Sequence, residues 1–175
     1  MRGGLSLRRY RQGDGSRVRE LHETAMRDVD AYTEGVADDD LEAVSETYLE
    51  GGGEFLVGEI DERIVAMGAF RPIDETDSLD RDVSERSGST VELTRVRVDP
   101  DHQRYGYGRR LCAELEDRAR SQGVTHIVLD TTAKQTAARR LYESMGYEET
   151  HRGRIEDFGD PFTLIVYEKS LVGDE

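Results

Sequence analysis

The sequence predicts an α/β fold in which a mixed sheet of about six to seven strands carries about four helices on its faces. Three observations predict it. Segments with the two-residue period of a strand alternate along the chain with segments that have the 3.6-residue period of a helix. Short clusters of Gly, Pro and Asp separate these segments. The predicted order is β-α-α-β-β-β-α-β-α-β-β, without an internal repeat or a linker, so we expect a single domain over residues 1–175.

Seven segments are predicted as strands, because their apolar residues alternate with polar ones or form short runs. They cover residues 5–10, 54–60, 63–70, 90–98, 125–131, 147–150 and 162–169. Asp61 and Glu62 join the second strand to the third, which predicts a hairpin. A break of three glycines, residues 51–53, precedes this hairpin.

Four segments are predicted as helices from apolar residues at helical spacing. They run from Asp14 or Ser16 to about Val29, from Asp38 to about Leu49, from Tyr107 to near Gly123, and over residues 138–145. The second helix begins with three aspartates, where the helix macrodipole favours negative charge. Gly146, after the fourth helix, is suited to a C-cap.

No periodicity survives between residues 71 and 88, where a proline stands among six acidic residues. We expect an exposed, mobile acidic loop here, and the alternative is a loop that gates a substrate site.

The composition excludes several classes of protein. Asp and Glu number 38 against 24 Lys and Arg, so the net charge is −14. A nucleic-acid-binding domain would carry a basic footprint, and an anionic membrane surface would repel this charge. The chain has no apolar stretch long enough to span a bilayer and no signal-peptide core, so we expect a cytoplasmic protein. An acidic surface that keeps arginine but almost no lysine resembles proteins of salt-loving organisms, where salt screens the self-repulsion.

Cysteine and histidine usage limits the chemistry further. The single Cys112 excludes an internal disulfide and a cysteine-based zinc site. The four histidines show no metal-ligand spacing, so we expect no metal.

Charge is unevenly distributed along the chain. Residues 93–122 hold seven arginines and five acids, so this segment carries +2, whereas the remainder has 17 basic and 33 acidic residues and carries −16. An anionic ligand at this segment would explain the difference.

The same segment contains the run Gln-Arg-Tyr-Gly-Tyr-Gly, residues 103–108, which follows a predicted strand and opens a predicted helix. Glycines let the backbone approach a ligand closely, and a helix N-terminus offers unpaired N–H groups, so the run predicts a phosphate site. It is not a dinucleotide-binding fingerprint, because Leu111 stands at the third glycine position, and the chain has no Gly-Lys-Ser/Thr tripeptide. The alternative is a tight loop without a ligand.

Three runs together resemble one family. Residues 96–100 (Val-Arg-Val-Asp-Pro), the loop 103–108 and residues 141–147 (Leu-Tyr-Glu-Ser-Met-Gly-Tyr) closely resemble the GNAT superfamily of acyl-CoA-dependent N-acyltransferases. The resemblance is strong over about residues 90–150, and the element order extends it across nearly the whole chain.

This resemblance implies acetyl-CoA or another acyl-CoA as donor. Its pyrophosphate would lie on the amides of residues 104–109, and its pantetheine arm would pair with residues 96–98, in a V-shaped cleft where this strand separates from the strand at 125–131. Many family members have Asn where this chain has Gln135. The implied cofactor-binding residues are Val96, Arg97, Val98, Gln103, Arg104, Tyr105, Gly106, Tyr107, Gly108, Arg109, Gln135 and Tyr142.

Two residues are candidates for the chemistry. In the family, a tyrosine at the position of Tyr142 often donates a proton to the leaving thiolate, and the alternative is an ordinary core tyrosine. The family also carries a β-bulge near Val96, which would aim a strand N–H at the thioester oxygen. Glu92 is the candidate base, because some relatives carry a glutamate at this distance before the first loop glycine. A solvent-facing glutamate, or a water chain to backbone carbonyls, is the alternative.

The predicted function is therefore an N-acetyltransferase (EC 2.3.1 class) that acetylates a primary amine of a small molecule or a protein by direct attack. The alternatives are a non-catalytic acyl-CoA-binding sensor on the same fold and, more remotely, a generic phosphate-binding α/β protein. Acids around Tyr32, at residues 28, 30, 34 and 38, would attract a cationic amine. Dimers are common in the family, so a homodimer is also an expectation, and no nucleic-acid or membrane partner is expected.

Overall fold

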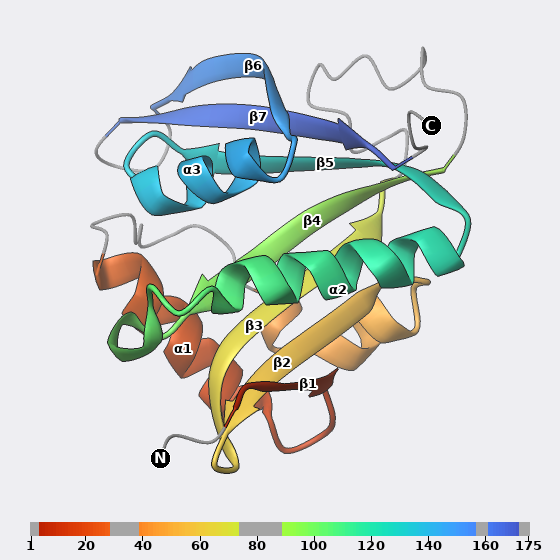
Figure 1. Ribbon diagram of the computed structural model, residues 1–175, viewed down its shortest axis with the longest axis vertical. Helices are drawn as coiled ribbons and strands as arrows, with labels where there is room; N and C mark the ends of the chain where they lie inside the picture. Colours follow the sequence, from red (N-terminus) through yellow and green to blue (C-terminus); the bar gives the residue numbers. More distant parts are fainter. Residues whose placement is uncertain (1–3, 29–38, 74–88, 157–160, 172–175) are drawn as a thin grey trace.

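The computed structural model describes residues 4–28, 39–73, 89–156 and 161–171, and this part of the chain forms one seven-stranded sheet (Figure 1). The strand order is β1-β2-β3-β4-β5-β7-β6. The strands are β1 (Ser6–Arg9), β2 (Glu54–Ile60), β3 (Arg63–Pro72), β4 (Ser89–Val98), β5 (Val124–Thr132), β6 (Glu148–Ile155) and β7 (Phe162–Ser170). All neighbours pair antiparallel except β4 and β5, which are parallel. The predicted mixed α/β sheet is confirmed.

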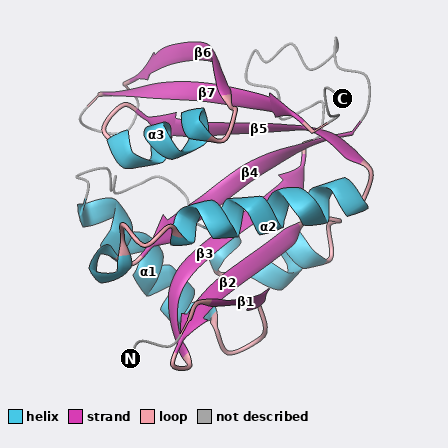
Figure 2. Cartoon of the chain, in the orientation of Figure 1, coloured by secondary structure: helices cyan, strands magenta, loops and turns pink. Residues whose placement is uncertain are grey.

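Helices cover both faces of this sheet (Figure 2). They are α1 (Gly15–Asp28), α2 (Tyr107–Ser121) and α3 (Thr136–Ser144). One apolar core lies between the sheet and α2 and includes Leu111 and Leu115. A second core lies between the sheet and α1 and includes Val18 and Leu21. The helix α3 lies on the same face as α2, in front of β5 and β7 (Figure 1).

The helix predicted over residues 38–49 is confirmed in part, because helical structure is present there but is not continuous. The described residues form a 3-10 turn, η1 (Asp39–Leu41), and a wide π-type turn, η2 (Ser45–Leu49). The carboxylate of Asp40 does not cap a helix, because it accepts hydrogen bonds from the guanidinium of Arg95 and the hydroxyl of Tyr48. A tertiary interaction has therefore displaced the local one.

The acidic loop also begins later than predicted. The strand β3 continues to Pro72, because Arg71 pairs with Glu92 and Pro72 pairs with Val91 across the sheet. The remainder of the predicted loop, residues 74–88, lies outside the described residues, and so do the acids predicted to attract an amine at residues 30, 34 and 38.

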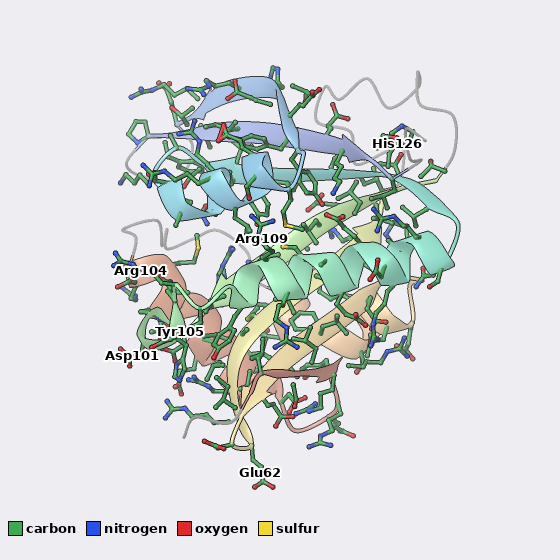
Figure 3. All side chains as sticks on the ribbon, viewed as in Figure 1. Glu62, Asp101, Arg104, Tyr105, Arg109 and His126 are labelled. Carbon is green, nitrogen blue, oxygen red and sulfur yellow. The ribbon has the colours of Figure 1, made fainter. Side chains whose placement is uncertain are left out.

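The hairpin of β2 and β3 is confirmed. Asp61 has φ 50° and Glu62 has φ 67°, so both residues of the turn adopt the left-handed conformation that a two-residue hairpin favours. Glu62 marks the tip of this hairpin at the lower end of the molecule (Figure 3).

The parallel strands β4 and β5 are paired over only part of their length. Pairing joins Ser89–Glu92 to the first residues of β5, Val124 to Val128, and the two strands separate beyond this point. We call the paired section the closed end and the separated section, from Leu93 in β4 and Leu129 in β5 onward, the open end. Figure 1 shows the two strands diverging toward the open end. The centrally splayed sheet that the family resemblance implied is confirmed.

Candidate active site

A cavity of about 430 Å³ lies at the open end. Its walls come from β4, the loop that follows it, the first turn of α2, the start of α3 and the last turns of α1. It is lined by Ala25, Met26, Val96, Arg97, Val98, His102, Gln103, Arg104, Gly106, Tyr107, Gly108, Arg109, Gln135, Ala137, Ala138, Leu141 and Tyr142. Eleven of the twelve predicted cofactor-binding residues therefore meet around one cavity.

A β-bulge in β4 decides which side chains face this cavity. Arg95 and Val96 together stand opposite the single residue Gly68 of β3, and Arg95 has φ 59°. An extra residue shifts the alternation of the strand, so every later side chain changes face. As a result Val96 and Val98 pack with the core under α2, while Arg95 and Arg97 point toward α1.

The loop after β4 has the features of an anion site. Gly106 is the N-cap of α2 in the left-handed conformation, with φ 79°, and the first helical turn contains no acidic residue. Arg104, which also lines the cavity, has φ 71°, a conformation that costs a non-glycine residue about 1–3 kcal/mol and is found often at ligand sites. The helix N-terminus adds unpaired N–H groups and a partial positive charge.

Close packing holds this loop near α3. A Cβ placed on Gly108 would lie 3.2 Å from the Cδ2 of Leu141 and 3.8 Å from the Cγ2 of Val98. A larger residue at position 108 would therefore push α2 away from α3. The guanidinium of Arg109 also donates a hydrogen bond to the hydroxyl of Ser144 at the end of α3.

One predicted loop residue is not part of the cavity wall. The side chain of Tyr105 is 55 % exposed and stacks on the ring of Tyr107, with 5.6 Å between the ring centroids. Figure 3 shows Tyr105 at the outer edge of the loop, near Arg104.

The arginines of the +2 segment do not all serve one ligand. Arg97, Arg104 and Arg109 line the cavity, whereas the other four have partners elsewhere. Arg95 binds Asp40, Arg110 binds the carbonyl oxygen of Leu5, Arg118 binds Glu54 and Glu114, and Arg120 binds Asp117. An anionic ligand in the cavity would therefore account for three of the seven arginines, and the other four bind acids or backbone of this chain.

The side chain of Gln135, which stands where many members of the family have asparagine, forms hydrogen bonds with the last residues of β5. Its Oε1 accepts hydrogen bonds from the hydroxyls of Thr131 and Thr132 and from the amide of Thr132, at 3.0 to 3.2 Å. Its Nε2 lies 3.8 Å from the Sδ of Met26 at the end of α1. Gln135 and Met26 thus meet across the cavity, one from each side of the open end.

Tyr142 lies in the wall of the cavity and also in the core. It is 6 % exposed, and its ring packs edge-to-face against Tyr147 with 5.7 Å between centroids. Burial raises the pKa of Tyr142 above its ordinary value of about 10, so the phenol is protonated at neutral pH. Its position fits both sequence interpretations, the proton donor and the core tyrosine.

The structure does not bring Glu92 into the cavity wall. Glu92 is the last paired residue of the closed end, on the face of the sheet toward α1, and its carboxylate lies 3.8 Å from the guanidinium of Arg71. Its side chain is half-buried rather than fully exposed.

His22 is a buried residue of this region that the sequence did not indicate. Its Nδ1 lies 3.2 Å from the Nε of Arg97, and its Nε2 lies 3.3 Å from an Nη of Arg95. Burial, aided by both guanidinium charges, lowers the pKa of His22 to about 3, so the ring is neutral at pH 7. A neutral imidazole accepts at one nitrogen only, so one of the two contacts is a hydrogen bond. His22 therefore contacts one arginine in the bulge, Arg95, and one after it, Arg97.

Other wall residues were missed because they looked like ordinary core. Ala138 and Leu141 belong to the apolar stripe of α3, and Ala25 to that of α1, so their spacing predicted burial without showing which stripe borders a cavity. Among the described residues, no group of three or more His, Cys, Asp or Glu could hold a metal ion. No helix within the described ranges is long and apolar enough to cross a membrane.

Comparison with protein families and curated proteins gives consistent matches. Residues 17–147 match the model of the acetyltransferase (GNAT) family. Human N-acetyltransferase 8 is 31% identical over 112 residues, which is 63% of this chain and 46% of that protein. The [ribosomal protein bS18]-alanine N-acetyltransferase of Escherichia coli (strain K12) is 44% identical over 57 residues, which is 33% of this chain and 38% of that protein. The chain thus spans less than half the length of these two curated relatives.

Solved structures resemble nearly the whole chain. The structure of yncA from Salmonella typhimurium, a putative acetyltransferase with its cofactor acetyl-CoA, has a TM-score of 0.75 and 26% identity, over 98% of this chain and 95% of that one. An acetyltransferase of the GNAT family from Staphylococcus aureus Mu50 has a TM-score of 0.76 and 19% identity, over 96% of this chain and 99% of that one. At 19% identity, the likeness to the Staphylococcus aureus protein shows a shared fold alone.

Proposed function

The chain belongs to the acetyltransferase (GNAT) family, and we propose that it transfers an acetyl group from acetyl-CoA to a primary amine. The observation that carries this proposal is the cavity at the open end, because its walls join a backbone anion site to a buried, protonated phenol. The two features match acetyl-CoA, because the anion site would bind its pyrophosphate and the phenol would protonate the thiolate that leaves its thioester. The relative from Salmonella typhimurium, 26% identical, holds acetyl-CoA.

The donor is proposed to bind along β4. The amides of residues 104–109 and the N-terminus of α2 would hold the pyrophosphate. The exposed backbone edge of β4 would pair with the amide groups of the pantetheine arm, because β5 no longer occupies this edge at the open end. Val96 and Val98 would supply apolar contacts for the arm.

The chemical step is direct attack. The amine nitrogen attacks the thioester carbonyl carbon, a C–N bond forms, and the carbonyl oxygen becomes an oxyanion. A backbone N–H at the bulge, near Val96, would donate to this oxyanion, because Arg95 and Val96 share one partner residue and the ladder is interrupted there. The C–S bond then breaks, and the thiolate takes a proton from the hydroxyl of Tyr142.

Glu92 is the proposed base. An amine that is protonated at neutral pH must lose a proton before it attacks, and the product amide forms with loss of a second one. Because Glu92 lies outside the cavity wall and beside Arg71, a water chain would carry the proton to it. Backbone carbonyls are the alternative relay.

The acceptor class is proposed as a primary amine of a small molecule or a protein. The alanine N-acetyltransferase of Escherichia coli acts, by its name, on a ribosomal protein. It is 44% identical to this chain over an aligned stretch of 57 residues. This likeness supports including peptide α-amines among the acceptors. The alternative to an enzyme is a sensor that binds acyl-CoA without transferring the acyl group.

An acceptor screen tests the proposal. Purified protein is incubated with acetyl-CoA and a panel of amino acids, polyamines, aminoglycosides and peptides, and released CoA thiol is measured at low and high salt. High salt is included because it screens the repulsion of a chain with a net charge of −14. We expect amine-dependent release of thiol. Acetyl-CoA binding without release in any condition supports the sensor, and failure to bind acetyl-CoA contradicts both.

A further inference from the structure

A buried carboxylate on α2, outside the cavity wall, has no part in the proposed chemistry. Glu116 lies on α2 with its side chain 4 % exposed. Its Oε2 accepts a hydrogen bond from the hydroxyl of Tyr147 at 3.0 Å, and its Oε1 accepts one from the ammonium of Lys169 at 2.8 Å. A guanidinium nitrogen of Arg120, one helical turn further, lies 3.6 Å from the same Oε1.

Two partners of Glu116, Tyr147 and Lys169, lie on the other side of the split in the sheet, whereas Arg120 lies on α2 itself. The helix α2 packs mainly over β2, β3 and β4 (Figure 1), whereas Tyr147 precedes β6 and Lys169 lies on β7. Lys169 pairs with Ile127 of β5, and Ile127 pairs with Val91 of β4. The contacts of Glu116 therefore cross the split beside the closed end, where only four residue pairs join β4 to β5.

The same contacts lead to Tyr142. The amide of Tyr147 donates a hydrogen bond to the carbonyl oxygen of Tyr142 at 3.0 Å, and the two rings meet edge-to-face. Burial and the neighbouring charge of Glu116 raise the pKa of Tyr147 above its ordinary value, so its hydroxyl stays protonated and donates. A shift of Tyr147 would therefore move the phenol of Tyr142 at the cavity wall.

We propose that Glu116 is a positioning residue, which ties α2 to Tyr147 and Lys169 across the split and so fixes Tyr142 in the cavity wall. This inference rests on the proposed function, because it assigns Glu116 a part in acetyl transfer. Such a pair is not needed for stability alone, because an apolar substitute for a buried ion pair is often neutral or stabilising. Its value lies in a fixed geometry between two parts of the sheet.

The chain offers a matched control in Glu54. This carboxylate is also buried, at 3 % exposure, and it binds two cations, Arg9 at 2.9 Å and Arg118 at 3.2 Å. Its partners lie on β1 and α2, and Glu54 itself lies on β2, so its contacts stay on one side of the split. Glu54→Gln and Glu116→Gln thus remove the same charge from similar surroundings, and only the second change affects a contact across the split.

The first experiment measures acetyl transfer. We expect Glu116→Gln and Tyr147→Phe to lower kcat about 5- to 50-fold while the Kd for acetyl-CoA, measured by calorimetry, changes less than about twofold. We expect Glu54→Gln to leave kcat within about twofold. Lys169→Arg, which keeps the positive charge, should retain more activity than Lys169→Met. Equal losses of kcat in Glu54→Gln and Glu116→Gln would overturn the inference, because they would reflect general destabilisation.

The second experiment does not depend on activity. Hydrogen–deuterium exchange of the β5 amides at residues 124–128 and of the turn at 145–147 should be about tenfold faster in Glu116→Gln than in wild type, and unchanged in Glu54→Gln. Unchanged exchange in Glu116→Gln overturns the inference whatever the activity. A third outcome separates the two proposals. If the wild type transfers no acetyl group but exchange is faster in Glu116→Gln, the proposed function is contradicted, and the contact across the split is still supported.

Discussion

The closed end and the open end of β4 and β5 show how one strand serves both as core and as the wall of a cavity. Val91 at the closed end and Val98 at the open end point to the same face of the sheet, and both belong to or border the core under α2. Val91 has β5 beside it and is 2 % exposed, whereas Val98 lines the cavity. The residue type is the same at both ends. The site arises because a neighbouring strand is withdrawn, and the bulge between the two valines keeps Val98 on this face.

The largest expected effect comes from blocking the anion site at the open end. Gly106→Trp should weaken acetyl-CoA binding about 100-fold or more, roughly 2.7 kcal/mol, because an indole would fill the space the pyrophosphate needs. Gly123→Trp is the matched control at the other end of α2. Both glycines have positive φ, 79° and 84°, and a Cβ at either meets no atom within 4 Å. Calorimetry should show near-normal affinity only in Gly123→Trp; weak binding in both variants would point to strain and not to the site.

Removing the phenol tests whether the open end carries the chemistry. Tyr142→Phe should lower kcat about 10- to 1,000-fold, because the proton donor is lost. The Kd for acetyl-CoA should change little, because the ring that would contact the ligand remains. Tyr167→Phe serves as control, since its hydroxyl is buried, accepts from Arg139 and lies outside the cavity wall. A normal kcat in Tyr142→Phe with a good acceptor would return Tyr142 to a purely structural role.

A substitution of Glu92 at the closed end tests whether this carboxylate removes a proton from the amine. Glu92→Gln should lower kcat about tenfold at neutral pH, and less as the pH rises, because a more basic solution deprotonates the amine without help. Arg71→Gln separates the base from its ion pair, since it removes the partner and leaves the carboxylate. If Arg71→Gln reproduces the loss of kcat, the effect of Glu92→Gln comes from the broken ion pair.

The two valines give a direct comparison of the ends. Val91→Ala should lower the free energy of unfolding by about 1–3 kcal/mol through a core cavity and leave acetyl-CoA affinity unchanged. Val98→Ala should change stability less and weaken acetyl-CoA binding about 4- to 15-fold, at about 0.8 kcal/mol for each lost CH₂ contact. Chemical denaturation and calorimetry measure both quantities. The reverse pattern would show that the pantetheine arm does not lie along β4.

The smallest expected effect is the response to alkaline pH. The pKa of Tyr142 is raised by burial, so its folded-state value lies above that of the unfolded chain, about 10. Its contribution to stability is therefore complete below pH 10 and is lost as the pH rises through the higher folded-state value. We expect no decline of kcat from this group between pH 7 and pH 10. A decline with a midpoint below pH 10 that disappears in Tyr142→Phe would contradict the assignment of its pKa.

Most of the fold could be predicted from local patterns. The period-two and period-3.6 segments and the turn at Asp61 and Glu62 depend on residues close in sequence, and the structure confirms them. The helix expected over residues 38–49 is divided into two short elements near Asp40, which binds Arg95, a partner 55 positions away that no local pattern contains.

The candidate site was predictable where it depends on the loop and the resemblance, and less so elsewhere. The orientation of Arg95 and Arg97 follows from a bulge that forms opposite Gly68 of another strand, so the sequence of β4 alone could not indicate it. Arg110 and Arg118 looked like part of a basic site because Leu5 and Glu54, which they bind, lie far away in the chain. Arg120 binds the nearby Asp117, a pair whose helical spacing was visible in the sequence. The sequence placed Glu92 correctly on its strand. Whether its side chain reaches the cavity depends on where β4 and β5 separate, which the sequence of β4 alone does not indicate.

The bulge has a further consequence during protein synthesis. Among the described strands the chain passes from one side of the split to the other once, through α2, so β1 to β4 are made before β5. At about 5–20 residues per second, the 26 positions from Val98 to Val124 take about 1 to 5 s. During that time β4 is an edge strand, which other nascent chains can pair with and aggregate. A bulge and two arginines on such an edge oppose this pairing. The irregularity that keeps Val98 on the cavity face of the finished sheet is therefore also of the kind that hinders an exposed strand edge from pairing with another chain.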